Sequence, residues 1–302
     1  MPRSVFLFPG QGAQAVGMGQ ALAARLPSVR SLYEEASAIL GYDLAAVSWN
    51  GPKQRLDSTA VSQPALFVAS LAALEVLRHD EPAAENHCVA TAGLSLGEYT
   101  ALAFAGALTF ADGLRVVKAR GEAMQAASDA APGGMVSVLG PEAAEVEAMC
   151  AEIAPTAGPI RVANLLCPGN TVVSGSAAAC EAIEKSVEAK GGRTIRLAVA
   201  GAFHTPFMKP ADEALAAALA GVTIRPPRVP VWSNVDAKPH TEPDEIRGLL
   251  VRQVLHPVLW EQTIRGLLAD GCDRFYEIGP GRVLAGLLKR VHRKAECVNV
   301  AA

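Results

Sequence analysis

A serine between two glycines has surroundings that favour covalent chemistry. Residues 93–97 read Gly-Leu-Ser-Leu-Gly, which fits the pattern G-x-S-x-G. An apolar run precedes this motif, and a predicted helix from Leu96 to about Ala107 follows it. In a tight turn from strand to helix, the glycines relieve crowding and the serine hydroxyl is exposed beside a helix N-terminus that can stabilise an oxyanion. The context predicts a nucleophile at Ser95, although a glycine-flanked serine in an ordinary loop fits the same pattern.

A serine hydroxyl is a poor nucleophile unless a base takes its proton, and histidine is the usual base. Five of the six histidines lie in polar surroundings or have nothing to favour them: His79, His87, His240, His256 and His292. His204 differs, because it follows the small-residue segment Leu197–Ala202, which is predicted to be a strand. A histidine in an apolar segment is more often structural, so the residues alone leave its role open.

Arg120 is predicted to lie on the apolar side of a helix. Asp112 can cap a helix that runs to about Ala127. On that helix Arg120 shares a face with Val117 and Met124, at spacings of three and four. A buried charge without a partner is costly, so Arg120 needs an anion, either a carboxylate of this chain or a bound ligand.

The elements that would position these residues alternate between strand and helix in the first part of the chain. We predict strands at Ser4–Phe8 and Cys88–Gly93 and helices at Val16–Leu40 and Gln63–Arg78. Alternation of this kind favours a parallel sheet with helices on its faces.

The middle of the chain has a different order of elements. Strand, helix, strand, strand, helix and strand are predicted at residues 134–139, 141–153, 160–165, 171–174, 177–190 and 193–199. That order is the ferredoxin-like split unit. The sequence therefore predicts an α/β fold with a large domain, residues 1–127 and 200–302, and an inserted small subdomain, residues 128–199.

Composition excludes several classes of protein. The net charge is only −3 and half of the 302 residues are apolar, which predicts a packed core and does not favour nucleic-acid binding. The apolar stretches look too short or too interrupted to span a bilayer. The six scattered cysteines include no CxxC pair, and the N-terminal apolar run is unlike a signal peptide. We therefore expect reduced thiols, no metal site, no membrane contact and a cytoplasmic location.

Five segments together resemble malonyl-CoA:acyl carrier protein transacylases. They are FPGQGAQ at residues 8–14, GLSLGEY at 93–99, GAFH at 201–204, VRQ at 251–253 and EIGPG at 277–281. They occur in the family's order and spacing along nearly the whole chain. The resemblance implies an α/β-hydrolase-like large domain with a ferredoxin-like insertion. The chain departs from the family at Leu94, where the family usually has histidine.

The resemblance also implies a role for each residue that matches a family motif. Ser95 would be the nucleophile and His204 its general base and acid, oriented by the backbone carbonyl of Gln253 in place of a triad carboxylate. Arg120 would bind the free carboxylate of the malonyl group. The backbone N–H groups of Gln11 and Leu96 would bind the oxyanion.

Two further positions take weaker roles from the resemblance. Phe203 would crowd the α-methyl group of methylmalonyl and so favour malonyl, a preference of about 1–3 kcal/mol. Asn164 aligns with a polar position near the family's site, although from the sequence alone it caps a strand turn.

The activity that the resemblance implies is malonyl transfer from malonyl-CoA to the phosphopantetheine thiol of acyl carrier protein. It would proceed through a malonyl-serine ester, with no metal or redox cofactor, and serve fatty acid biosynthesis. A discrete acyltransferase of a polyketide pathway is an alternative. A serine esterase or thioesterase, or a homologue that only binds carrier protein, are others.

Overall fold

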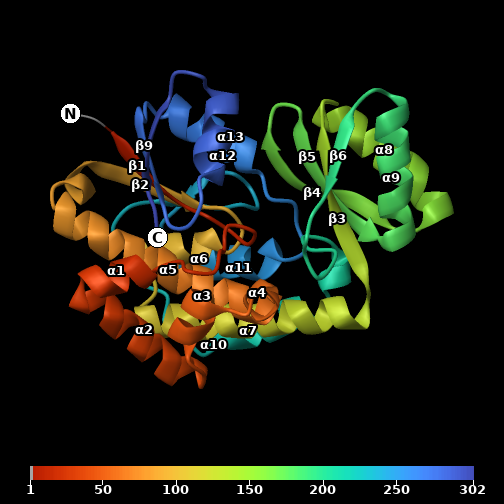
Figure 1. The fold of residues 1–302 in the computed structure, drawn as a ribbon. Helices are drawn as coiled ribbons and strands as arrows, with labels where there is room; N and C mark the ends of the chain where they lie inside the picture. Colours follow the sequence, from red (N-terminus) through yellow and green to blue (C-terminus); the bar gives the residue numbers. More distant parts are fainter. Residues whose placement is uncertain (1–2) are drawn as a thin grey trace.

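The computed structural model describes residues 3–302, which form a large lobe and a smaller lobe (Figure 1). The large lobe is built on a six-stranded sheet with the strand order β10-β9-β1-β2-β7-β8. All neighbouring strands are parallel except β8, which is antiparallel to β7. The strands are β1 (Ser4–Phe8), β2 (Cys88–Gly93), β7 (Val231–Trp232), β8 (Pro239–His240), β9 (Arg274–Ile278) and β10 (Glu296–Val300).

Helices cover both faces of this sheet, which explains why β1 is apolar at almost every position. Val5 and Leu7 pack on one face in a cluster with residues of α12 (Trp260–Ala269) and α13 (Val283–Val291). Phe6 and Phe8 point to the other face, toward α5 (Thr59–Asp80) and α6 (Gly97–Phe104). Outside α5 lies α7 (Phe110–Ala130), and α10 (Ala211–Ala220) packs against α7 (Figure 1).

The remaining helices of the large lobe lie around this core. They are α1 (Gln20–Arg25), α2 (Pro27–Leu40), α3 (Leu44–Asn50), α4 (Lys53–Asp57), α11 (Pro243–Gln253) and the short 3-10 helices η1 (Ala84–His87) and η2 (Pro206–Met208). The single helix expected over residues 16–40 is two helices, because Pro27 begins a new one after the extended residue Leu26.

The small lobe contains β3 (Gly133–Leu139), α8 (Ala143–Ala157), β4 (Ile160–Cys167), β5 (Asn170–Ser176), α9 (Ala177–Ala189) and β6 (Arg193–Arg196). Its antiparallel sheet has the strand order β4-β5-β3-β6. Strand β3 alternates as a half-buried strand should: Val136 and Val138 join the core with α8 and α9, and Met135 and Ser137 face the other way. The predicted fold class, α/β with a ferredoxin-like insertion, is confirmed.

Two local predictions near the site are wrong. Helix α7 is capped by Thr109, whose Oγ1 accepts a hydrogen bond from the N–H of Asp112, so Asp112 lies in the first turn of the helix. No strand forms over Leu197–Ala202, because β6 pairs with β3 only as far as Arg196. The chain then leaves the sheet edge and runs toward the large lobe as an irregular segment.

Helix α5 also differs from expectation. It is long and apolar enough, by length and composition, to cross a membrane, but 83% of that apolar window is buried inside the protein. A helix packed between a sheet and a second layer of helices must be apolar on all sides, so its hydropathy reflects the protein core.

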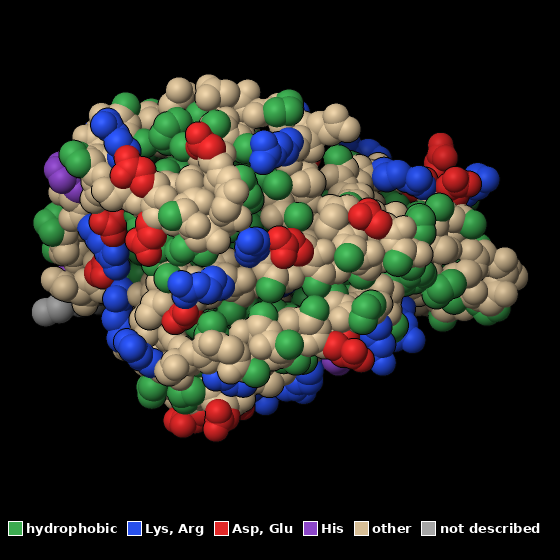
Figure 2. Space-filling view, turned by 90° about the horizontal axis from the view of Figure 1, so that it is seen from below, with side chains coloured by type: hydrophobic (Ala, Val, Ile, Leu, Met, Phe, Trp, Pro, Cys, Tyr) green, Lys and Arg blue, Asp and Glu red, His purple; other side chains and the backbone are tan. Residues whose placement is uncertain are grey.

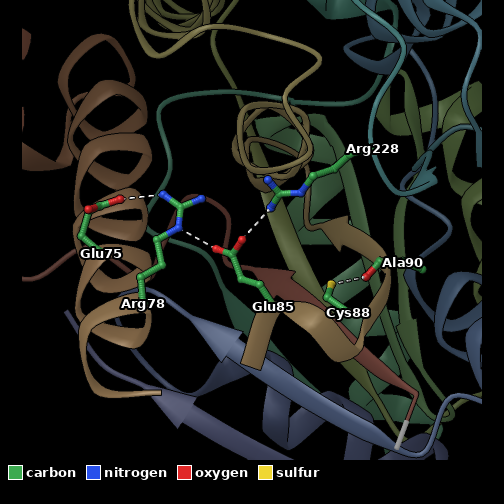
Figure 3. A network of polar contacts seen from close by, with 6 residues as sticks. All are labelled: Glu75, Arg78, Glu85, Cys88, Ala90 and Arg228. Carbon is green, nitrogen blue, oxygen red and sulfur yellow. Dashed lines mark hydrogen bonds and ion pairs between the residues drawn. The ribbon is translucent and has the colours of Figure 1, made fainter. Parts of the chain in front are cut away.

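Charged groups hold the approach to β2 at the surface. Arg78 at the end of α5 donates hydrogen bonds to Glu75 and to Glu85 of η1, and Glu85 also accepts one from Arg228 (Figure 3). Elsewhere, on the face seen in Figure 2, Lys and Arg side chains are interspersed with Asp and Glu. That mixture agrees with the small net charge and does not form a basic stripe on this face.

Candidate active site

The motif at residues 93–97 forms the sharp turn between β2 and α6. Ser95 has a φ of 50°, in the left-handed region that side chains rarely adopt. The two glycines are needed because the backbone packs against itself here. A Cβ on Gly93 would lie 1.9 Å from the carbonyl carbon of Gly97, and a Cβ on Gly97 would lie 2.1 Å from the carbonyl oxygen of Phe8. We call residues 93–97 the nucleophile turn.

His204 reaches the nucleophile turn from the irregular segment that follows β6. Its Nε2 lies 2.9 Å from Ser95 Oγ, and its Nδ1 lies 2.9 Å from the backbone carbonyl oxygen of Gln253. A carbonyl oxygen can only accept, so Nδ1 carries the proton and Nε2 of the neutral ring is left as an acceptor. Gln253 is the last residue of α11, where helix carbonyls lack partners within the helix.

Arg120 is buried beside the serine, with 1% of its surface exposed. Its Nη2 donates to Ser95 Oγ and to Gln253 Oε1, both at 2.9 Å, and its Nη1 donates to Gln63 Oε1 at 2.7 Å. No carboxylate of residues 3–302 forms a salt bridge with it, and its Nε has no hydrogen-bond partner among them. The guanidinium also lies over the ring of Tyr99, 5.2 Å from the ring centre.

Burial and the Arg120 charge control the protonation of the site. Burial, and after it the charge of Arg120, lower the pKa of His204 to about 4. The imidazole is therefore neutral near pH 7 and able to accept a proton. Burial raises the pKa of Glu98, in the first turn of α6, to about 7.

Two backbone N–H groups near Ser95 have no acceptor within the described part of the chain. They belong to Leu96, which begins α6, and to Gln11, in the turn after β1. The side chain of Gln11 donates to Thr59 Oγ1 at 3.3 Å. Free N–H groups beside a nucleophile can bind a developing oxyanion.

A cavity of about 70 Å³ contains the side chains of Ser95, His204 and Arg120, together with Phe203 and Met124. It adjoins a second cavity of about 210 Å³, and the two share the lining residues Gly10, Gln11, Leu94, Asn164 and Leu197. Both lie between the lobes, since Met135 and Ser137 of β3 also line them. The site is thus a small pocket at the end of a longer cleft.

All eight residues singled out from the sequence lie at or beside this pocket. Asn164 is on β4, where it lines both cavities, and its buried Oδ1 has no partner among residues 3–302. It does not cap a strand turn. Leu94, in place of the family's histidine, presents an apolar side chain to the same two cavities.

Sequence reasoning missed three residues that contact this site: Gln63, Glu98 and Asn234. Gln63 is a polar residue in the otherwise apolar core of α5, and that exception was a detectable signal. Glu98 stood inside a quoted motif without a role. For Asn234, in the turn after β7, we find no local signal.

Comparisons with known proteins agree with this geometry. The family model of the acyl transferase domain matches residues 5–302. The mitochondrial malonyl-CoA-acyl carrier protein transacylase of Mus musculus is 45% identical over 304 residues, covering 97% of this chain and 80% of its own length. The malonyl CoA-acyl carrier protein transacylase of Escherichia coli (strain K12) is 41% identical, covering 96% of this chain and 93% of its own.

Solved structures also resemble this chain. That of the malonyl CoA-acyl carrier protein transacylase from Coxiella burnetii has a TM-score of 0.93 and 37% identity, covering 99% of this chain and 94% of its own. A type II PKS malonyl-transacylase, solved in complex with its acyl-carrier protein, has a TM-score of 0.92 and 37% identity, covering 99% and 96%.

Proposed function

We propose that this chain, which belongs to the malonyl-CoA-acyl carrier protein transacylase family, transfers a malonyl group from malonyl-CoA to the phosphopantetheine thiol of acyl carrier protein. The observation that carries the proposal is the Arg120 guanidinium, buried next to Ser95 and without a carboxylate partner in residues 3–302. A buried cation needs an anion, and the free carboxylate of malonyl supplies one. A neutral acyl group would leave Arg120 unpaired.

In the first half-reaction, Ser95 Oγ attacks the thioester carbonyl while His204 Nε2 takes the hydroxyl proton. The 2.9 Å contact between these atoms and the Nδ1–H bond to Gln253 support that direction of transfer. The carbonyl oxygen becomes an oxyanion, which the N–H groups of Gln11 and Leu96 bind. The C–S bond then breaks, His204 returns the proton to the coenzyme A sulfur, and a malonyl ester remains on Ser95.

In the second half-reaction, the phosphopantetheine thiol enters the same cleft. His204 takes the thiol proton, the sulfur attacks the ester carbonyl, and the C–O bond to Ser95 breaks as the proton returns to Oγ. Atoms and protons balance without a metal or redox cofactor. Because the two acyl carriers use one site in turn, the kinetics are ping-pong.

Several residues would set the substrate. Phe203, which is buried against the pocket, would crowd an α-methyl group. The unpartnered Asn164 Oδ1 would accept a hydrogen bond from an amide N–H of the pantetheine arm that lies in the larger cavity. The acyl carrier protein of fatty acid synthesis is the proposed partner. The likeness to a type II PKS transacylase makes a polyketide carrier protein the second candidate.

We also propose a reducing compartment for the protein. The six cysteines form no disulfide in the described residues, and burial raises the pKa of the Cys88 thiol to about 12. Relatives include bacterial and mitochondrial proteins, so the cytoplasm and the mitochondrial matrix are both reducing locations that fit.

Mass spectrometry of the intact protein tests the function. Mixed with malonyl-CoA, the protein is expected to gain one malonyl group, and to lose it when holo acyl carrier protein is added. Ser95→Ala is the control, because it removes only the attacking oxygen. Cleavage of neutral esters without a malonyl-enzyme would instead identify an esterase and reject the proposal.

A further inference from the structure

Asn234 is a buried residue whose four polar groups all have partners. It lies in the turn after β7 and is 1% exposed. Its Oδ1 accepts a hydrogen bond from the N–H of Ser95 at 2.6 Å, and its Nδ2 donates to the carbonyl of Gly93 at 2.7 Å. Its own N–H donates to Glu98 Oε2 at 3.0 Å, and its carbonyl accepts from the N–H of Leu259 at 2.9 Å.

These partners require an asparagine amide in one orientation. A backbone N–H can only donate and a backbone carbonyl can only accept, so the oxygen must face Ser95 and the nitrogen must face Gly93. Aspartate would place a second acceptor against the Gly93 carbonyl, and alanine would offer neither group.

We propose that Asn234 is a positioning residue for the nucleophile: it holds the nucleophile turn on both sides of Ser95 and occupies the N–H of Ser95. This inference rests on the proposed function and deepens it. A residue with φ of 50° is strained unless its surroundings hold it, and Asn234 supplies two of the contacts that do so.

Occupying the Ser95 N–H has a consequence for the oxyanion. Three backbone N–H groups lie near the hydroxyl, those of Gln11, Ser95 and Leu96. Because Asn234 takes that of Ser95, only the other two remain without an acceptor in the described chain. Asn234 therefore directs the substrate carbonyl oxygen toward Gln11 and Leu96.

Glu98 links Asn234 to the rest of the site. Its Oε2 accepts from the N–H of Asn234 and also, at 2.6 Å, from Nε2 of Gln253. That amide nitrogen donates to the Ser95 carbonyl as well, at 3.1 Å, so the amide oxygen is turned toward Arg120. The buried carboxyl group of Glu98, 3% exposed, thus holds both Asn234 and the residue that orients His204.

The test is the rate of malonyl-enzyme formation in Asn234→Ala and in the isosteric Asn234→Asp. Misplacing the hydroxyl by about 1 Å costs on the order of 10²-fold in rate, so we expect kcat for malonyl transfer to fall about 30- to 100-fold. The KM for malonyl-CoA is expected to stay within about twofold, because Asn234 does not contact Arg120.

Thr91→Val is the matched control. Thr91 is buried in β2, and its Oγ1 donates to the carbonyl of Phe6 at 2.8 Å without contacting the nucleophile turn. The variant removes a buried hydrogen bond of similar strength from the same sheet. We expect its kcat to stay within about twofold of wild type at a comparable loss of thermal stability.

Each outcome decides the inference. A kcat for folded Asn234→Ala or Asn234→Asp within about threefold of the Thr91→Val value would overturn it, as would a rise in KM that accounts for the whole loss. If neither variant folds, Asn234 is a folding determinant and the positioning role is rejected. Absence of malonyl-enzyme in the wild type would instead reject the proposed function.

Discussion

The guanidinium of Arg120 donates a hydrogen bond from Nη2 to Ser95 Oγ across 2.9 Å, so the cation and the nucleophile are in direct contact. Ser95 Oγ accepts this bond and has its own proton left to donate to His204, 2.9 Å away. The positive charge also favours negative charge developing on the serine oxygen during attack. The residue proposed to bind the malonyl carboxylate is therefore part of the catalytic geometry.

Arg120→Ala should lower kcat/KM for malonyl-CoA. A hydrogen bond to a charged group contributes about 1.5–3 kcal/mol, so we expect a loss of at least about 10- to 100-fold. Transfer of acetyl should become more competitive. Arg115→Ala, which changes an exposed arginine on the same helix, is the control and should keep wild-type activity. An unchanged preference for malonyl over acetyl in Arg120→Ala would contradict the role.

The pH dependence of serine reactivity should report the His204 pKa of about 4. Above about pH 5 the imidazole is neutral, so inactivation by a neutral sulfonyl fluoride should be independent of pH, and it should slow as the pH falls through the pKa. Arg120→Met removes the nearby charge that lowers this pKa, so the acidic limb should move to higher pH. Arg115→Met should leave the limb in place. A limb that stays or moves to lower pH in Arg120→Met would show that burial alone controls His204.

Gln63→Glu should weaken malonyl binding more than Gln63→Leu does. The amide oxygen of Gln63 accepts from Arg120 Nη1 at 2.7 Å, and a carboxylate there would pair with Arg120 and compete with the substrate. We expect the KM for malonyl-CoA to rise about tenfold or more in the glutamate variant. Steady-state kinetics check this, and equal KM values for the two variants would argue against competition for Arg120.

Phe203→Ala should relax selection against methylmalonyl-CoA. The ring lines the smaller cavity beside His204, and discrimination of a methyl group is worth about 1–3 kcal/mol. The ratio of kcat/KM for malonyl to that for methylmalonyl should fall by about 10-fold or more. Competition between the two thioesters, read by mass spectrometry of the acyl-enzyme, measures it. A ratio equal to that of wild type would remove Phe203 from substrate selection.

Gly97→Ala should destabilise the protein, because the new Cβ would lie 2.1 Å from the carbonyl oxygen of Phe8 and one backbone segment must move. Strain of this kind typically lowers the free energy of unfolding by about 1–3 kcal/mol. Gly248→Ala is the control: it lies in α11 with no atom within 4 Å of its new Cβ, so helix propensity should stabilise it slightly. Urea unfolding of both variants checks the opposite signs.

Much of this protein is determined by patterns that are local in the sequence. Strand β2 ends at Gly93 as predicted, because an apolar run bounded by a glycine-rich turn needs no distant information. The order of strands and helices in the small lobe follows from periodicity in the same way. The failures are local as well: Thr109 outcompeted Asp112 as helix cap, and Leu197–Ala202 found no strand to pair with.

The surroundings of Ser95 were decided by the tertiary structure. Arg120 was expected to need an anion, but whether a carboxylate of this chain supplied it depended on packing, which placed Gln63, 57 residues away, against it instead. Asn234 contacts Ser95 across 139 residues, and only the folded sheet brings the turn after β7 beside the turn after β2. Local sequence encodes backbone preference and burial, whereas hydrogen-bond partners far apart in the chain are chosen when the elements pack.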